Sequence, residues 1–189
     1  MNKQPFFAPE KLMTDIFTIR SYMPGDGALL AEAVNASYEH LKTFMVWAKP
    51  HTEVVEMERN VRRWRAQYLL NENFTLGIFS PAGDRLLGSS GFHLREGDLE
   101  NGAAEVGLWI RVDAAGQGLG TRVLRALLDW GFSAWPWERI TWRCDARNIA
   151  SRRTAEKAGM CYEGCMRAVH RLPDGSREDS LCFAQLRNS

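Results

Sequence analysis

The stretch from Ala115 to Thr121 carries three glycines at alternate positions, immediately before a helical pattern. Glycine lets the backbone turn tightly and come close to a ligand. The first N–H groups of a helix lack internal partners, and together with the helix dipole they form a site for an anion such as a pyrophosphate. We therefore expect a phosphate-binding turn made of Ala115, Gly116, Gln117, Gly118, Leu119, Gly120 and Thr121.

Two common phosphate-binding turns do not fit this segment. A Walker loop ends in Gly-Lys-Ser/Thr, and no lysine is present here. A dinucleotide-binding turn carries Gly-x-Gly-x-x-Gly soon after a first strand, with an acidic residue about 20 residues further on. Here the glycines alternate and lie late in the chain. Taken alone, the segment also permits a glycine-rich turn between a strand and a helix that binds no ligand.

The elements that position this turn follow from hydrophobic periodicity. Alternating or apolar runs predict strands at 15–22, 73–79, 86–94, 103–112 and 138–145, and two more on either side of the turn 173–176. Spacings of three and four predict helices at about 26–41, from an N-cap at Thr52 to Tyr68, at 119–132 and at 148–159. The order β-α-α-β-β-β-α-β-α-β-β predicts a mixed α/β sheet.

The composition indicates a single globular domain over residues 1–189, with 45% hydrophobic and 25% charged residues. No apolar run approaches the roughly 18 residues of a membrane-spanning helix, and no secretory signal pattern is present. We therefore expect a cytoplasmic protein with no membrane partner. A net charge of +1 gives no support for a nucleic-acid partner. The cysteines form no CxxC or zinc spacing, so we expect no metal and reduced, mostly buried thiols at Cys144, Cys161, Cys165 and Cys182.

Two motifs occur together in a specific order and separation. The first runs from Glu105-Val-Gly-Leu-Trp-Ile into the glycine turn, and the second comprises Asn148-Ile-Ala-Ser and Glu156-Lys-Ala-Gly-Met. Over residues 15–186 they resemble the GNAT superfamily of N-acetyltransferases, closest to its RimJ/RimL-like branch. The resemblance implies a mixed, mostly antiparallel central sheet of about seven strands flanked by about four helices. It also implies acetyl-CoA as the acyl donor, a primary amine as acceptor, and a homodimer.

The resemblance assigns binding of the CoA phosphates and pantetheine arm to particular residues. The family's turn pattern, Gln/Arg-x-x-Gly-x-Gly/Ala, falls on Ala115, Gly118 and Gly120. Ala115 departs from the Gln/Arg of the pattern, but the backbone amides that hold the pyrophosphate do not need that side chain. Asn148 would hold the pantetheine chain.

Further roles are implied for one strand and one helix. Leu108, Trp109 and Ile110 would diverge from the neighbouring strand and bind pantetheine, and one backbone N–H would stabilise the tetrahedral oxyanion. Ser151 would interact with the CoA sulfur as the leaving-group acid, because the Tyr that many members use is replaced by Ala155. The alternative for Ser151 is a capping role in the first turn of its helix.

Several residues are candidates for the general base. Glu105 could receive the proton of the amine directly or through one water, and its alternative is a partly exposed glutamate of a strand. His93 and His170 lie on predicted strands and are rivals, and Asp179 is a further candidate. Attack by the amine is expected to be direct, because no Cys or Ser lies in a recognisable nucleophile setting.

The sequence suggests a class of acceptor amine but leaves alternatives open. The run Phe44-Met45-Val46-Trp47 lies where this superfamily often lines the acceptor site, although four apolar loop residues can equally anchor a core. At pH 7, deprotonating a protein N-terminal amine costs about 1.4 kcal/mol, against about 4.6 kcal/mol for lysine. A weak base therefore suits a protein N-terminus, which the RimL-like resemblance also implies. Alternatives are a small amine (an antibiotic, polyamine or amino acid) and a non-catalytic acyl-CoA sensor.

Overall fold

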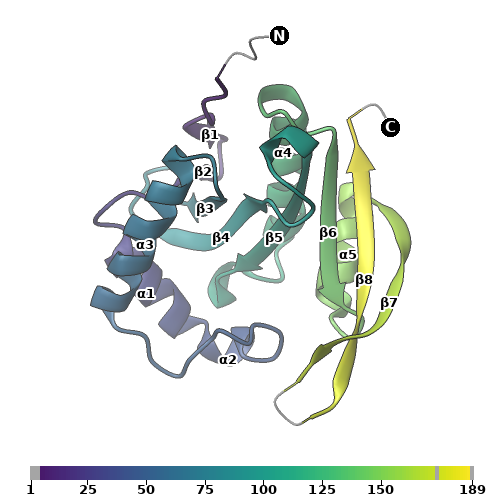
Figure 1. Cartoon of the computed structure of the whole chain (residues 1–189). Coiled ribbons are helices and arrows are strands. Elements are labelled where there is room, and N and C mark those ends of the chain that lie inside the picture. The colour runs from purple at the N-terminus through teal and green to yellow at the C-terminus, as the bar shows by residue number, and fades with distance from the viewer. Residues whose placement is uncertain (1–4, 173–174, 188–189) are drawn as a thin grey trace.

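A computed structural model describes residues 5–172 and 175–187 of the chain. Within these residues one sheet has eight strands in the order β1-β2-β3-β4-β5-β6-β8-β7 (Figure 1). Every neighbouring pair is antiparallel except β5 and β6, which are parallel. The strands are β1 Lys11–Met13, β2 Thr18–Ser21, β3 Phe74–Phe79, β4 Leu86–His93, β5 Ala103–Ile110, β6 Arg139–Asp145, β7 Cys161–Arg171 and β8 Arg177–Leu186.

Helices pack on the sheet as two separate groups, which bury different sets of strand side chains (Figure 1). The α-helices are α1 Gly27–Ala36, α2 Tyr38–Leu41, α3 Val54–Leu69, α4 Leu119–Ala134 and α5 Ile149–Ala158, and the 3-10 helices are η1 Leu99–Asn101 and η2 Val112–Ala114. Helices α1 and α3 pack on each other and on β2, β3 and β4, whereas α4 packs on β5 and α5. Within the described residues, no helix is both long enough and apolar enough to cross a bilayer.

The larger hydrophobic core fixes the beginning of β6 against the middle of the sheet. Trp135 and Trp137, which precede β6, stack with ring centroids 5.9 Å apart. Both rings pack against Phe74 of β3 and Phe92 of β4. Burial of large aromatic rings is a dominant source of core stability. This core therefore anchors β6 at its first residues, which is the end where it pairs with β5.

The expected mixed, mostly antiparallel α/β fold is confirmed, with local differences. The helix expected at 26–41 is divided at Ser37 into α1 and α2. The hydroxyl of buried Ser37 accepts a hydrogen bond from the backbone N–H of Val112 at 3.1 Å, which ties this point to the end of β5. The short strand β1, only three residues long, was not predicted. β7 and β8 are the predicted final pair, and residues 173 and 174 of their connection lie outside the described residues.

Two expectations about single residues are wrong. Thr52 is not the N-cap of α3, which begins after Glu53. Instead the backbone N–H and C=O of buried Thr52 are both hydrogen-bonded to the side chain of Asn35, at 2.8 and 3.0 Å. The cysteines are free as expected, but they are not mostly buried, since Cys161 and Cys165 are exposed. Both lie on β7, the strand at one edge of the sheet, most of whose side chains are exposed.

Candidate active site

The parallel strands β5 and β6 pair over a short length and then diverge (Figure 1). Residues 103–105 of β5 pair with residues 139–141 of β6, and no pairing continues beyond them. Residues 105–110 stay paired to β4 on the other side. The backbone N–H and C=O groups of β5 that point toward β6 beyond Glu105 are therefore free to bind a ligand. The divergence expected at Leu108–Ile110 is confirmed.

Side chains of β5 alternate between two environments at this opening. A Cβ placed on Gly107 would lie 3.7 Å from the Nε2 of His93, so Gly107 faces the side of His93, as do Glu105 and Trp109 by alternation. A Cβ placed on Gly120 of α4 would lie 3.7 and 3.8 Å from Ile110 and Leu108. Leu108 and Ile110 therefore face α4 and the glycine turn. The opening between β5 and β6 connects the two sides.

The glycine turn has the geometry of an anion site. Gly116 and Gly118 have φ of +74° and +77°, a conformation that side chains disfavour, and no atom lies within 4 Å of a Cβ on either. Among the described residues, the backbone N–H groups of residues 116–121 have no hydrogen-bond partner. The N–H of Ala115 is different, because it donates to the C=O of Val112. Free amides at the start of α4 therefore begin at Gly116 and run to Thr121.

Asn148 and Ser151 form the start of α5 beside the opening. The Oδ1 of Asn148 caps the helix by accepting from the backbone N–H of Ser151 at 3.0 Å. The cap that the sequence predicted at Asn148 is thus present, and it holds the two residues together. Trp142 of β6 donates its Nε1–H to the Oγ of Ser151 at 3.2 Å. That bond uses a lone pair of the hydroxyl, and Ser151 also forms a side-chain hydrogen bond with Cys144, so its proton would have to turn from that sulfur toward a ligand.

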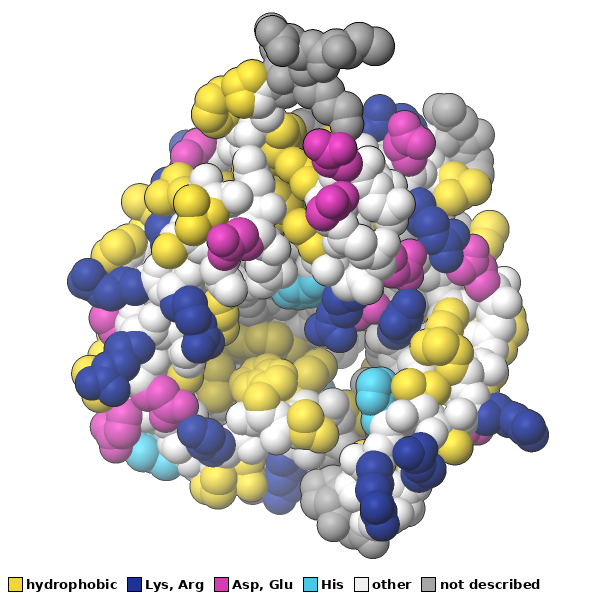
Figure 2. Space-filling view, viewed as in Figure 1, with side chains coloured by type: hydrophobic (Ala, Val, Ile, Leu, Met, Phe, Trp, Pro, Cys, Tyr) yellow, Lys and Arg dark blue, Asp and Glu magenta, His cyan; other side chains and the backbone are white. Residues whose placement is uncertain are grey.

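One cavity of about 960 Å³ brings the two motifs together. Glu105, Leu108, Trp109, Asn148 and Ser151 all line it. Ile110 and residues 115–121 are not among its lining residues, so the glycine turn lies outside the cavity. Figure 2 shows the hollow in the surface, with apolar side chains on one side and basic side chains on the other.

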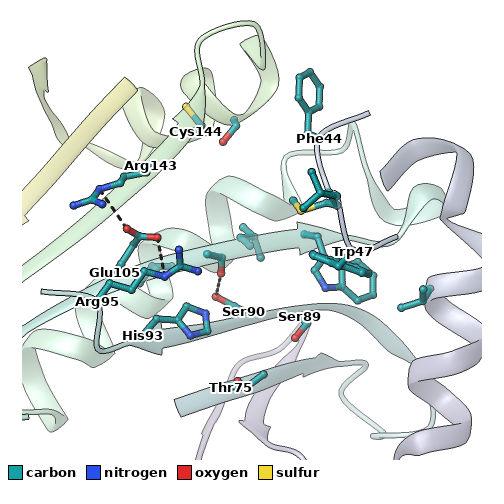
Figure 3. Close-up of a pocket in the computed structure, with 18 of the residues that line it drawn as sticks. Phe44, Trp47, Thr75, Ser89, Ser90, His93, Arg95, Glu105, Arg143 and Cys144 are labelled. Atoms are coloured by element: carbon teal, nitrogen blue, oxygen red, sulfur yellow. Dashed lines mark hydrogen bonds and ion pairs between the residues drawn. The ribbon is translucent and has the colours of Figure 1, made fainter. Parts of the chain in front are cut away.

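Glu105 is a buried carboxylate inside this cavity rather than a partly exposed strand residue. Its side chain is 8% exposed, and burial is the main cause that raises its pKa. Arg95 and Arg143 lie on either side, each with Nε 3.4 Å from one carboxylate oxygen, and both oppose this rise (Figure 3). Among the described residues, no group hydrogen-bonds the buried Oε2. This oxygen is instead ion-paired with the Nε of Arg143, so the carboxylate retains unused hydrogen-bonding capacity.

The rival bases differ in position. His93 and His170 both line the cavity. Asp179 does not, and its Oδ1 instead accepts from the backbone N–H of Ala168 at 2.8 Å. Ala168 has φ of +53° within an irregular part of β7, so Asp179 stabilises the backbone there. The structure thus favours Glu105 and the two histidines over Asp179.

The loop expected to line the acceptor site does line the cavity. Phe44, Met45, Val46 and Trp47 are all among its lining residues, at the end away from Glu105 (Figure 3). Val46 is 83% exposed and Trp47 47% exposed, so these residues are not core anchors. The ring of Trp47 lies 6.2 Å from that of Trp109. The cavity therefore has an aromatic end and a charged end.

Sequence reasoning missed several polar residues of the cavity. Arg95 and Arg143 were not singled out, because arginines on strands and loops carry no spacing signal. Asp145 and Glu178 also line the cavity and share a side-chain hydrogen bond. The Arg147 side chain is the main cause that lowers the pKa of Asp145, whereas burial and Asp145 raise that of Glu178. The position of Glu178 in the last strand, next to the already noted Asp179, is the one signal that could have found it.

The fold and the site together define a class of enzyme. Residues 17–161 match the acetyltransferase (GNAT) domain family, so the chain belongs to this family and is an N-acetyltransferase. "Probable N-acetyltransferase YjcK" of Bacillus subtilis is 29% identical over 143 residues, which cover 75% of this chain and 77% of that protein.

Solved structures share the fold. RimL, a ribosomal L7/L12 alpha-N-protein acetyltransferase solved with coenzyme A, has a TM-score of 0.83 at 22% identity, covering 94% of this chain and 98% of RimL. The microcin C7 self-immunity acetyltransferase MccE, solved with acetyl-CoA and AMP, has a TM-score of 0.80 at 18% identity, covering 92% of this chain and 93% of MccE. At these identities the likeness shows the fold alone.

Proposed function

We propose that this enzyme transfers an acetyl group from acetyl-CoA to the α-amine of a protein N-terminus. One observation carries the proposal: Glu105 and Ser151, from different elements, line one cavity at the point where β5 and β6 diverge. Glu105 belongs to the side of β5 opposite the glycine turn. An amine and a thioester entering from opposite sides would meet at this opening.

The free backbone groups fit acetyl-CoA in two places. The unpartnered N–H groups of residues 116–121, at the positive end of α4, suit the pyrophosphate. The free edge of β5 beyond Glu105 suits the amides of the pantetheine arm, and one N–H there would polarise the thioester carbonyl. The Nδ2 of Asn148 would contact the arm, because its Oδ1 already caps α5.

The chemistry is a direct acyl transfer. The amine nitrogen bonds to the carbonyl carbon and the carbon–sulfur bond breaks, which gives an amide and CoA. The amine proton passes to Glu105 and then to solvent. The departing thiolate receives a hydrogen bond from the hydroxyl of Ser151 and takes up a proton.

The choice of an α-amine follows from the strength of the base. Burial raises the pKa of Glu105 and Arg95 and Arg143 oppose this rise, but a carboxylate remains a weaker base than an imidazole or an amine. A weak base suits an amine whose pKa lies near 8 better than a lysine near 10.4. The names of RimL and of the ribosomal-protein-S5-alanine acetyltransferase of Vibrio fischeri, which has the same fold, support a ribosomal protein as acceptor class.

A panel of acceptors tests the proposal. CoA release would be followed with acetyl-CoA and three amine classes: peptides with free N-termini, the same peptides N-blocked but containing lysine, and small amines such as polyamines and amino acids. We expect turnover on the free N-terminal peptides. Turnover restricted to small amines would reject the protein acceptor. CoA binding without turnover on any amine would instead indicate an acyl-CoA sensor.

A further inference from the structure

His93 lies beside Glu105 on a part of the sheet where two neighbouring glycines carry no side chain. It is the last residue of β4 and lies directly opposite Glu105 in the antiparallel pairing with β5. The next pair on the same face of the sheet is Gly91 and Gly107, neither of which carries a side chain. The ring of His93 leans over this pair: its Nε2 lies 3.0 Å from a Cβ placed on Gly91 and 3.7 Å from one placed on Gly107. Figure 3 shows the ring below Glu105 in the cavity.

The contact with Asn73 favours one tautomer of His93. The Nδ1 of His93 lies 2.9 Å from the Oδ1 of Asn73. In the orientation present here, the Nδ2 of Asn73 donates to the Oγ1 of Thr75 at 3.1 Å, which leaves Oδ1 facing His93. Because Oδ1 can only accept, Nδ1 must carry the hydrogen. The lone pair of a neutral ring is therefore on Nε2, which has no hydrogen-bond partner among the described residues.

The ring is neutral under ordinary conditions. Burial, together with the positive charge of Arg95, lowers the pKa of His93 to about 4. The other charged groups that line the cavity are Glu105 of β5, Arg143 and Asp145 of β6, Glu178 of β8, Glu56 and Arg63 of α3, and Lys49. An imidazolium would repel an incoming ammonium, whereas a neutral ring attracts it. The burial of this histidine thus suits it to accept a hydrogen bond from a cation.

We propose that His93, through Nε2, binds the amino group of the acceptor, and that Gly107, which carries no side chain, leaves room for it. The carboxylate of Glu105, which lines the same cavity, is the second acceptor of this amine site and takes the proton when the amine attacks. His93 orients the nitrogen and does not itself have to be protonated. This inference rests on the proposed function, since it names the groups that hold the amine of that reaction.

Substitution of His93 separates amine binding from a structural role. In His93→Ala we expect the KM for the acceptor to rise about tenfold or more, with the KM for acetyl-CoA unchanged. His93→Gln, whose amide oxygen can accept the same hydrogen bond, should recover part of the loss. A purely structural histidine would change both KM values and the melting temperature together. An unchanged acceptor KM in folded His93→Ala would overturn the proposal.

Two further variants keep the proposal testable if His93→Ala does not fold. Gly107→Ala adds a methyl group with ordinary contacts of 3.7 Å to His93, so it should fold normally and raise only the acceptor KM. Asn73→Asp puts a negative charge beside Nδ1, which raises the pKa of His93 and moves the acidic limb of the kcat/KM profile to higher pH. If neither variant shows its expected effect while the wild type acetylates peptide N-termini, His93 does not bind the amine, and the proposed function is unaffected. If the wild type acetylates no amine, the proposed function fails as well.

Discussion

The indole Nε1–H of Trp142 donates a hydrogen bond to the hydroxyl oxygen of Ser151 at 3.2 Å. Trp142 is 4% exposed and belongs to the main hydrophobic core, so its ring is fixed by packing. The bond connects β6, which diverges from β5 at the site, to the first turn of α5. A rigid core residue therefore sets the direction in which Ser151 can donate its proton.

Removing the hydroxyl of Ser151 should slow the chemical step. We expect Ser151→Ala to lower kcat by about tenfold or more, because the departing thiolate loses its hydrogen bond. Its affinity for CoA should stay unchanged, since the free amides of the glycine turn are untouched. Steady-state kinetics and calorimetric titration with CoA measure the two quantities. Equal kcat values would assign Ser151 to capping alone.

Trp142→Phe should reduce kcat by a smaller factor than Ser151→Ala. The variant removes the Nε1–H that orients Ser151 but keeps an aromatic ring in the core. In the double variant Ser151→Ala/Trp142→Phe the two effects should not add, because the indole then has no hydroxyl to orient. Trp137→Phe is the matched control, since Trp137 is also buried but its Nε1 has no hydrogen-bond partner among the described residues. Additive losses would show that Trp142 acts through packing only.

Gly118→Ala should weaken binding of acetyl-CoA through its phosphates. Alanine is strained at φ of +77°, and its methyl group would lie on an open turn that we assign to the pyrophosphate. We expect a higher KM for acetyl-CoA but not for S-acetyl-pantetheine, which lacks the pyrophosphate. Gly83→Ala is the control, because Gly83 has φ of +78° and an equally open surround in the turn between β3 and β4. Similar KM changes in both variants would reject the assignment.

Glu105→Gln should separate activity from stability. Burial raises the folded-state pKa of Glu105, so the charged form destabilises the folded protein, and this effect sets in as the pH rises through that pKa. The variant should therefore be at least as stable as the wild type at pH 7, with the difference fading in acid. Its kcat/KM should fall by about 100-fold or more, because the base is lost.

Melting curves over a pH series and kinetics with an N-terminal peptide measure these effects of Glu105→Gln. A variant that is clearly less stable at pH 7 would show that the ion pairs with Arg95 and Arg143 outweigh burial. Unchanged kcat/KM would remove Glu105 from the proton transfer.

Local features of this protein could be predicted from its sequence. The glycine turn and the caps at Asn148 and Gly159 depend on backbone conformations that only a few residue types favour, and all of them are present. The strands from 74 to 110 follow from periodicity, because alternation with the pleat is a property of neighbouring residues. Two motifs at a fixed separation were enough to predict the fold.

Other local features of the structure depend on contacts between residues that are far apart in the sequence. The break at Ser37 and the failed cap at Thr52 depend on Val112 and Asn35, which no local pattern connects to them.

The amine site shows the same division most clearly. The sequence supplied Glu105 and His93 as separate candidates on two predicted strands, but strand register made them neighbours and left Gly91 and Gly107 beside them. Burial, which depends on the packing of the whole sheet, then shifted the pKa of each group away from its usual value. The residue types in the sequence thus determined which chemical groups this site can use. The distances between these groups and their charge states depend on the pairing of strands that are distant in the sequence.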